Sequence, residues 1–263
     1  MLGVTITFGS LFAGCGGGDL GLERAGMECE WQVEIDPMCR KVLEKHWPHV
    51  SRFCDVHDVG RHNLEAVDLI IGGFPCQPFS SAGKQRGTED DRWLWPQMER
   101  VIEELRPRWV IGENTPGVDR LALGQIISGL EGIGYKVGPP LEIPACAIGA
   151  DHLRYRTWIL GYSNHEGESE MPINDETSRV PEAIRRHTER GRGSLGRNAS
   201  GIGRVGEPIP GYRIGEQKNN PGGMGGKDGL PGRMDRLRMI GNAMHVDVVE
   251  MIGRAIMEAA PHP

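Results

Sequence analysis

The 263-residue chain lacks the features that mark several common classes of protein. Its six cysteines are scattered and none forms a Cys-x-x-Cys pair, which favours reduced cytosolic thiols over a disulfide framework or a zinc site. No apolar run approaches the roughly 20 residues of a transmembrane helix. The apolar first residues lack the basic start of a signal peptide. We therefore expect a soluble, cytoplasmic and monomeric protein that binds neither metal nor membrane.

The chain also lacks an excess of positive charge. Its 30 Lys and Arg residues stand against 36 Asp and Glu residues, which gives a formal net charge of -6. The whole chain is therefore not a basic nucleic-acid binder, and any such binding must come from local patches. The length suits one α/β domain with a smaller module.

Strand-like and helix-like segments alternate up to about residue 161. Strands are expected near residues 6–12, 30–35, 67–71, 109–113, 135–139 and 158–161, and helices near 20–25, 37–45, 96–105 and 123–133. This alternation predicts an α/β fold with a mostly parallel, doubly wound sheet and helices on both faces. Apolar residues at helical spacing in 246–257 predict a last helix that docks back on this domain.

The most informative stretch is residues 72–81, GGFPCQPFSS. A short apolar run feeds into two glycines and then into Cys76, which stands between Pro75 and Gln77-Pro78. The prolines fix φ on both sides of the thiol and remove backbone donors. Such a frame indicates a cysteine presented as a nucleophile at a strand end, where the alternative is a buried thiol that only fills space.

Three further polar groups fall at strand ends. Glu113 closes the apolar run 109–112, and Arg154 and Arg156 precede the run 158–161. Each alone could be structural: a strand-end Glu often caps a helix, and a surface Arg is usually solvated. In a doubly wound sheet, however, the ends of consecutive strands meet in one crevice. The pattern thus predicts that a thiol, a carboxylate and two guanidinium groups converge.

A glycine-rich turn follows the first expected strand. Gly16, Gly18 and Gly21 satisfy G-x-G-x-x-G, and Glu34 ends the next strand, where it could accept hydrogen bonds from ribose hydroxyls. Asp55, after a third strand, could face an adenine edge, although a solvated carboxylate or a helix cap is an equal alternative. The pattern leaves open a nicotinamide oxidoreductase, an S-adenosylmethionine-dependent methyltransferase and a tight turn without ligand.

Taken in order, these motifs resemble those of the DNA cytosine-5 methyltransferases. The resemblance rests on residues 12–17, Pro75-Cys76-Gln77, Glu113-Asn114, Arg154-x-Arg156 and Gly241-Asn242-Ala243. It covers roughly residues 7–161 and 231–257, and Pro-Cys-Gln with Glu-Asn downstream is its most specific part. The tail 229–242 resembles the closing motif of phage and bacterial members.

The resemblance implies a Rossmann-like, S-adenosylmethionine-dependent fold and a reaction on a flipped cytosine in double-stranded DNA. It implies the catalytic residues Cys76, Glu113, Arg154 and Arg156. It implies that residues 79–95 form a mobile loop, which contacts the DNA through Ser80, Lys84, Gln85, Arg86 and Arg92. It places the following residues in the cofactor pocket: Phe12, Ala13, Gly14, Gly16, Gly17, Glu34, Ile35, Asp55, Val56, Pro75, Leu94, Asn242 and Ala243.

The resemblance also divides the chain. Residues 1–162 would form the catalytic and cofactor-binding domain, and 233–263 would complete it. Residues 163–232, rich in Gly and Arg, would be a short target recognition region that is partly disordered without DNA. The chain departs from the family pattern at three places: His152 where many members have Gln, Thr115 where Val is usual, and Met244-His245-Val246 where the closing motif often has Val-Val-Pro.

Three other functions stay open at this point. One branch of the same family methylates tRNA, and the arginine-rich region argues for DNA instead. A nicotinamide oxidoreductase would explain the glycine turn but would leave Cys76, Glu113 and the arginine pair unused. A DNA-binding module without activity is opposed by the presence of Cys76 and Glu113.

Overall fold

The structure is a computed structural model of the chain. It describes residues 5–75, 93–116, 120–148, 154–163, 184 and 242–259. Several sequence predictions therefore lie outside the described residues: those on Cys76, Ser80, Lys84, Gln85, Arg86, Arg92 and His152, and almost all of those on 163–232.

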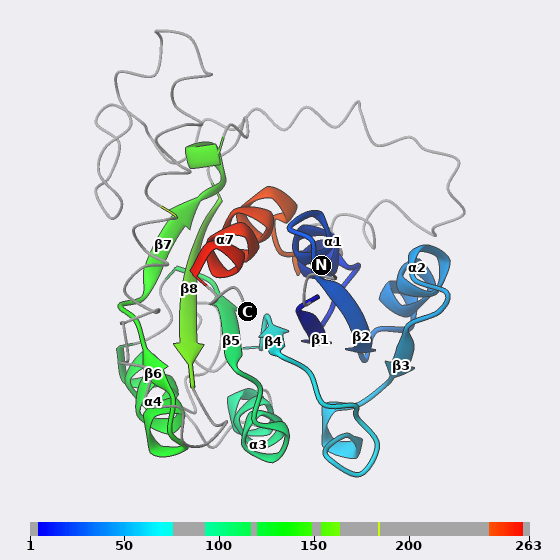
Figure 1. Ribbon diagram of the computed structural model, residues 1–263, viewed down its shortest axis with the longest axis horizontal. Helices are drawn as coiled ribbons and strands as arrows, with labels where there is room; N and C mark the ends of the chain where they lie inside the picture. Colours follow the sequence, from blue (N-terminus) through cyan, green and yellow to red (C-terminus); the bar gives the residue numbers. More distant parts are fainter. Residues whose placement is uncertain are drawn as a thin grey trace, which may run out of the picture.

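One sheet runs through the described part of the chain, with strand order β3-β2-β1-β4-β5-β8-β6 (Figure 1). The first five strands in this order are mutually parallel. Their bounds are β1 Thr7–Leu11, β2 Glu28–Val33, β3 Ser51–Phe53, β4 Leu69–Gly72 and β5 Trp109–Asn114. Because β1 pairs with both β2 and β4, the order reverses at β1, which is where open α/β sheets form their ligand crevice.

The other end of the sheet is antiparallel. Strand β8 runs opposite to β5, β6 and β7, which pair with it in turn. These strands are β6 Lys136–Val137, β7 Leu141–Pro144 and β8 Tyr155–Tyr162. The sequence predicted a strand near 158–161, and β7 was not predicted. The reversal places the first residues of β8 at the edge where the parallel strands end.

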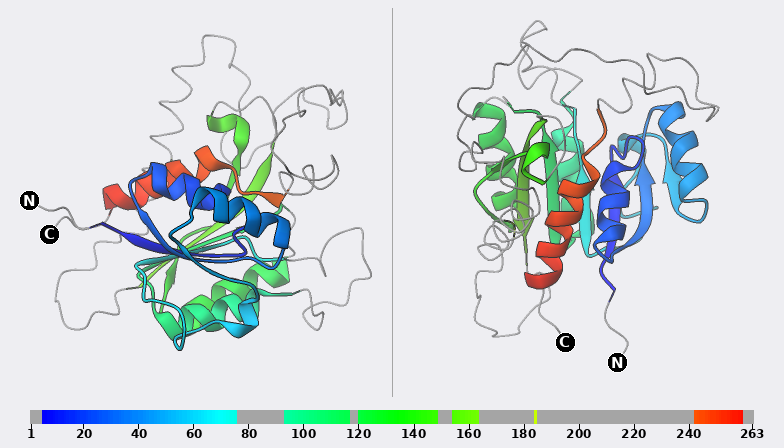
Figure 2. Two further views of the ribbon diagram at one scale, coloured as in Figure 1. Left: turned by 90° about the vertical axis from the view of Figure 1, so that its right-hand side faces the viewer. Right: turned by 90° about the horizontal axis from the view of Figure 1, so that it is seen from above.

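Helices cover both faces of the sheet (Figure 2). On one face lie α1 Gly17–Arg24, α2 Pro37–His46 and α7 Val246–Ala259, and on the other lie α3 Trp95–Leu105 and α4 Arg120–Gly132. Strand β4 shows why its run is apolar throughout: Leu69 and Ile71 join the core on the α1 and α7 side, and Ile70 joins the core on the α3 side. The predicted mostly parallel, doubly wound α/β sheet is confirmed.

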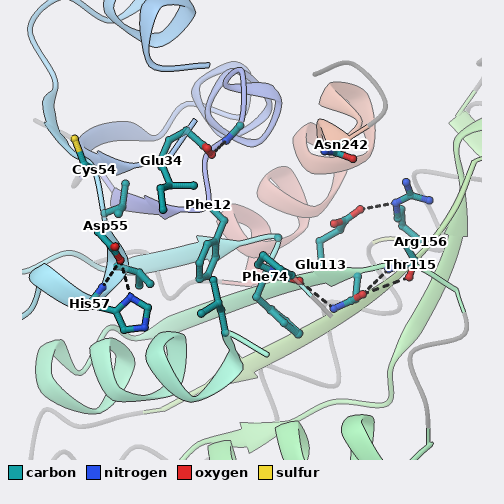
Figure 3. A pocket seen from close by; sticks show the side chains of 18 residues that line it. Phe12, Glu34, Cys54, Asp55, His57, Phe74, Glu113, Thr115, Arg156 and Asn242 are labelled. Carbon is teal, nitrogen blue, oxygen red and sulfur yellow. Dashed lines mark hydrogen bonds and ion pairs between the residues drawn. The ribbon is translucent and has the colours of Figure 1, made fainter. Parts of the chain in front are cut away.

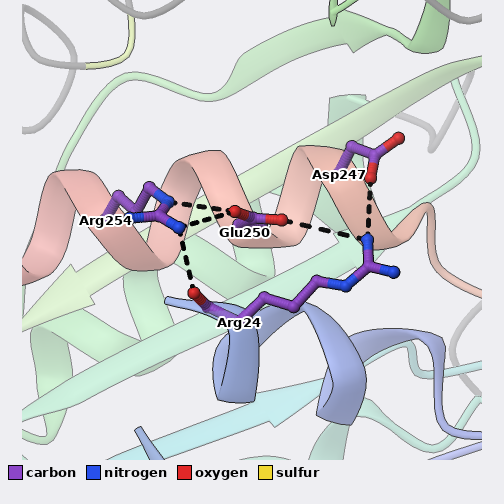
Figure 4. Close-up of polar contacts among 4 residues, drawn as sticks. All are labelled: Arg24, Asp247, Glu250 and Arg254. Atoms are coloured by element: carbon purple, nitrogen blue, oxygen red, sulfur yellow. Dashed lines mark hydrogen bonds and ion pairs between the residues drawn. The ribbon is translucent and has the colours of Figure 1, made fainter. Parts of the chain in front are cut away.

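The last helix lies directly against the first. A Cβ atom on Gly21 of α1 would lie 2.6 Å from Cβ of Val249 on α7, so no larger residue fits between them. At the exposed rim, Arg24 of α1 contacts Asp247 of α7 at 3.2 Å, and Arg254 pairs with Glu250 within α7 at 2.8 Å (Figure 4). Exposed ion pairs contribute little to stability. Close apolar packing is therefore what attaches α7 to the amino-terminal part of the sheet.

No helix in the described residues combines the length and apolar character that crossing a membrane requires.

Candidate active site

A cavity of about 530 Å³ lies at the edge where the parallel strands end. Residues that follow β1, β2, β3, β4 and β5 all contribute to its wall, as the doubly wound order predicts. Figure 3 shows the side chains that line it. The lining comprises Phe12, Gly14, Val33, Glu34, Ile35, Cys54, Asp55, Val56, His57, Gly73, Phe74, Pro75, Leu94, Glu113, Asn114, Thr115, Arg156 and Asn242.

The turn after β1 is held open by unusual backbone geometry. Phe12 has a φ of 55°, which a bulky residue rarely adopts, and Gly14 has a φ of 57°. Glu34 fixes this turn: its Oε2 accepts from the Gly14 N–H at 2.7 Å, and its Oε1 accepts from the Asp36 N–H at 2.7 Å. Burial raises the pKa of Glu34, while those two backbone bonds oppose the rise. Strained residues gather at ligand sites, so the turn is a candidate ligand contact.

The glycines at positions 16 to 18 serve a second purpose. A Cβ on Gly17 would lie 2.3 Å from the Met244 carbonyl oxygen, and one on Gly18 would lie 3.0 Å from Met244 Sδ. A Cβ on Gly16 would lie 2.4 Å from the Trp47 ring. These glycines therefore allow close packing of α1 against the segment before α7 and against the end of α2. That role was not expected from the sequence.

Asp55 forms the cavity wall after β3. It caps a short 3-10 turn, Val56–Asp58, and its Oδ1 accepts the backbone N–H of His57 at 2.9 Å. The Nδ1 of His57 lies 2.6 Å from the same oxygen. The backbone and side-chain bonds from His57 lower the pKa of Asp55, so this carboxylate stays charged. Asp55 thus offers an ionised acceptor at this end of the cavity.

The opposite end holds a buried acid and its counter-charge. Glu113, at the end of β5, is 7% exposed, and its Oε1 lies 2.8 Å from Arg156 Nε on β8. The two groups pair by charge, yet no donor within the described residues is aligned for a hydrogen bond to that oxygen. Burial raises the pKa of Glu113, and the nearby guanidinium groups of Arg156 and Arg154 oppose the rise.

Arg154 takes a different position from Arg156. It donates to the Ala243 carbonyl at 2.7 Å and does not line the cavity. Burial lowers the pKa of Arg154, followed by repulsion from Arg156. Arg154 therefore links the start of β8 to the Asn242-Ala243 turn, where Asn242 reaches the cavity. Segments almost ninety positions apart in the chain meet at this contact.

The backbone that leads to Cys76 is anchored on both sides. Asn114 Nδ2 donates to the Phe74 carbonyl at 3.2 Å, and the Leu94 N–H approaches the Pro75 carbonyl at 3.5 Å. The Phe74 ring also meets Trp93 edge-on, with 6.0 Å between centroids. Pro75 and Leu94 thus lie next to each other, on the two sides of residues 76–92.

The structure brings most of the described sequence-predicted residues together. Nine of the cofactor residues line the cavity, as do Glu113 and Arg156. Ala13, Gly16, Gly17, Ala243 and Arg154 lie outside its lining. Within the described residues, no group of three or more metal-ligating side chains occurs.

Sequence reasoning missed seven lining residues. Some were visible as neighbours of predicted ones, since Cys54 and His57 flank Asp55-Val56, and Gly73-Phe74 precede Pro75. The complete set is Val33, Cys54, His57, Gly73, Phe74, Asn114 and Thr115. Position next to a strand end was the available signal for all of them.

Comparison with known proteins points to one enzyme family. The family model described as C-5 cytosine-specific DNA methylase matches residues 6–198. Type II methyltransferase M.HgiCII of Herpetosiphon aurantiacus is 36% identical over 166 residues, which are 61% of this chain and 38% of that protein. Type II methyltransferase M.PspPI of Psychrobacter sp. is 42% identical over 158 residues, 57% of this chain and 38% of that protein. The matches thus span well under half of these relatives.

Solved structures share the fold. A prophage-encoded candidate DNA modification methyltransferase of E. coli aligns with a TM-score of 0.53 and 28% identity, over 60% of this chain and 47% of that one. The methyltransferase EhMeth of Entamoeba histolytica aligns with a TM-score of 0.53 and 17% identity, over 64% of this chain and 56% of that one. The second likeness concerns the fold alone.

Proposed function

The chain belongs to the C-5 cytosine-specific DNA methylase family, and on this premise we propose that it transfers a methyl group from S-adenosylmethionine to C5 of a cytosine in duplex DNA. The observation that carries the proposal is the buried Glu113 beside Arg156, in the wall of a cavity that also reaches Glu34 and Asp55. A nicotinamide oxidoreductase would have no use for that pair next to the Cys76 segment.

The cavity suits S-adenosylmethionine in size and in the chemistry of its wall. About 530 Å³ lies within the range of small-molecule sites. Glu34 keeps acceptor capacity for ribose hydroxyls beyond its two backbone bonds, since a carboxylate has about four lone-pair sites. Val56 and Ile35, a residue that is 69% exposed, offer apolar surface to a ring. When bound, this cofactor supplies the electrophilic methyl group that the activated C5 takes.

The residues of the chain would activate the cytosine. The Cys76 thiolate forms a bond to C6, and Glu113 gives its proton to N3, so that the electrons of the broken C5–C6 double bond become available at C5. Arg156 holds the base carbonyl O2. After methylation, water acts as the base that takes the C5 proton. The electrons of the broken C5–H bond form the C5–C6 double bond and expel the thiolate from C6, and the N3 proton returns to Glu113. The cycle thus regenerates the thiolate and the protonated Glu113, and releases one proton to solvent.

The environment of Glu113 supports its part in this scheme. Burial raises the pKa of its carboxyl group, which favours the protonated form that donates to N3. Arg156 limits the rise and orients the carboxyl group.

We further propose that different parts of the chain have the roles that the resemblance implies. The target base reaches Cys76 after it is flipped from the duplex. Ser80, Lys84, Gln85, Arg86 and Arg92 would contact the DNA, and region 163–232 would read the target sequence. Residues 1–162 and 233–263 would together form the catalytic unit, in which Arg154 fixes the turn that carries Asn242.

Expression in a host without cytosine methylation, followed by bisulfite sequencing of its DNA, tests the proposal. We expect 5-methylcytosine in one sequence context with the wild-type chain and none with Cys76→Ser. Absence of methylation by the folded wild-type chain, or methylation by the serine variant, would contradict it. In vitro transfer to duplex DNA and to tRNA distinguishes the two substrate classes.

A further inference from the structure

One contact at the β3 end of the cavity has no part in the proposed methyl transfer. His57 donates its backbone N–H to Asp55 Oδ1 at 2.9 Å, and its ring Nδ1 lies 2.6 Å from the same oxygen (Figure 3). Because an ionised carboxylate can only accept, the ring nitrogen that faces it must carry a proton. Both side chains line the cavity, so this pair forms part of a ligand-binding wall.

The two bonds hold the carboxylate in one orientation. They both end on Oδ1, and within the described part of the chain Oδ2 accepts no hydrogen bond. The same bonds lower the pKa of Asp55, so the group stays ionised at neutral pH. The result is a fixed, charged acceptor with one oxygen free for a donor on the ligand.

The topology indicates which part of a ligand meets this acceptor. The cavity extends from Glu113 at the end of β5 to Asp55 after β3, with Glu34 after the strand between β3 and β1. A methyl group that must reach a base beside Glu113 places the remote end of the cofactor near Asp55. Val56 and Ile35 supply apolar walls there, which suits the faces of a flat ring. The group that meets Asp55 is then an edge of that ring.

We propose that His57 is a positioning residue that makes this site selective for a 6-amino purine over a 6-oxo purine. The inference rests on the proposed use of S-adenosylmethionine. An amino group donates to Asp55 Oδ2, whereas a carbonyl oxygen at the same place repels the carboxylate and leaves it unpaired. Without the Nδ1 donor, the Asp55 carboxylate turns more freely, and the preference for the 6-amino purine over the 6-oxo purine becomes smaller.

The test uses S-adenosylhomocysteine and its 6-oxo analogue, S-inosylhomocysteine, with the full chain and isothermal titration calorimetry. Wild type should bind the adenosyl compound at least about tenfold more tightly, the scale of one hydrogen bond to a charged group. His57→Asn keeps an amide donor at the Nδ1 position and should keep this ratio of the two affinities. His57→Gln moves the amide to the Nε2 position, and His57→Ala removes it, so both should reduce the ratio to about threefold or less.

The outcomes separate this inference from the function on which it rests. A wild-type ratio retained in both His57→Gln and His57→Ala would overturn the inference, as would an equal loss in His57→Asn. Wild type that binds both compounds equally would overturn it too, with the cofactor site standing. Wild type that binds neither compound would count against the proposed cofactor itself. Far-ultraviolet circular dichroism confirms that each variant is folded.

Discussion

Asp19 is a carboxyl group that the proposed chemistry does not use, and it predicts how stability depends on pH. It is fully buried in α1, where Gln32 Nε2 donates to its Oδ1 at 2.8 Å and Ser10 Oγ donates to its Oδ2 at 3.3 Å. Burial raises its pKa from 3.8 to about 6, and the bonds from Gln32 and Ser10 only partly oppose this. The folded protein thus holds a proton that the unfolded chain has already released.

Proton linkage gives the sign and the size of the change in stability with pH. Between these two pKa values the folded state binds more protons, so the free energy of unfolding falls as the pH rises through about 6. At about 1.4 kcal/mol for each pH unit between them, the full loss is about 3 kcal/mol. About 1.4 kcal/mol of this loss of stability occurs between pH 5 and pH 8, because the unfolded chain is already ionised at pH 5.

Asp19→Asn removes this term while keeping the shape of the side chain. Its oxygen can accept from Gln32 Nε2, and its amide can donate to Ser10 Oγ. We expect urea unfolding, followed by tryptophan fluorescence, to measure the free energy of unfolding of both proteins. The value for the variant minus that for wild type should increase by about 1.4 kcal/mol from pH 5 to pH 8. Glu34 titrates in both proteins and cancels in the difference. A difference that stays constant or shrinks with pH would refute the reasoning.

Three further predictions concern packing and chemistry. Gly21→Ala should destabilise the protein by roughly 1–3 kcal/mol, because the new Cβ meets Val249. Gly124→Ala, also within a helix but with nothing within 4 Å of the new Cβ, should raise the free energy of unfolding by about 0.5–1 kcal/mol. Equal urea midpoints for the two variants would contradict this. Glu113→Gln should lower kcat at least about 100-fold, on the scale of general-acid catalysis, while calorimetry shows unchanged binding of S-adenosylhomocysteine; a kcat near wild type would remove Glu113 from the mechanism. DNA with 5-fluorocytosine should form a covalent adduct that survives denaturing electrophoresis with wild type and not with Cys76→Ala, since fluorine cannot leave as a proton does; lack of adduct from an active enzyme would exclude attack on C6.

Much of the fold could be predicted because apolar runs report burial directly. The run that became β4 is buried on both faces and predicted a central parallel strand. The reversal at β8 could not be predicted from strand–helix alternation alone. Its direction follows from the short link 145–154, which joins β7 to β8 as antiparallel neighbours. The four residues of β7, which end in proline, are too few to show a periodicity.

The site was predictable to the extent that it depends on strand ends. Glu113 and Arg156 meet because β5 and β8 pair in antiparallel register, which brings the end of one strand to the start of the other. The separate position of Arg154 depends on where the Ala243 carbonyl lies in space. His57 was missed because it contacts Asp55, and a sequence pattern does not show which side chain a histidine contacts.

The direction of β8 has a consequence for engineering. Ser163, just past its end, donates its N–H to the Arg108 carbonyl at the edge where β5 begins, whereas Asn242 lies at the cavity on the opposite edge. The two attachment points of segment 164–241 are therefore separated by about the length of an eight-residue strand, some 26 Å. A segment transplanted from another protein must bridge that span, and a linker of a few residues would pull α7 out of register.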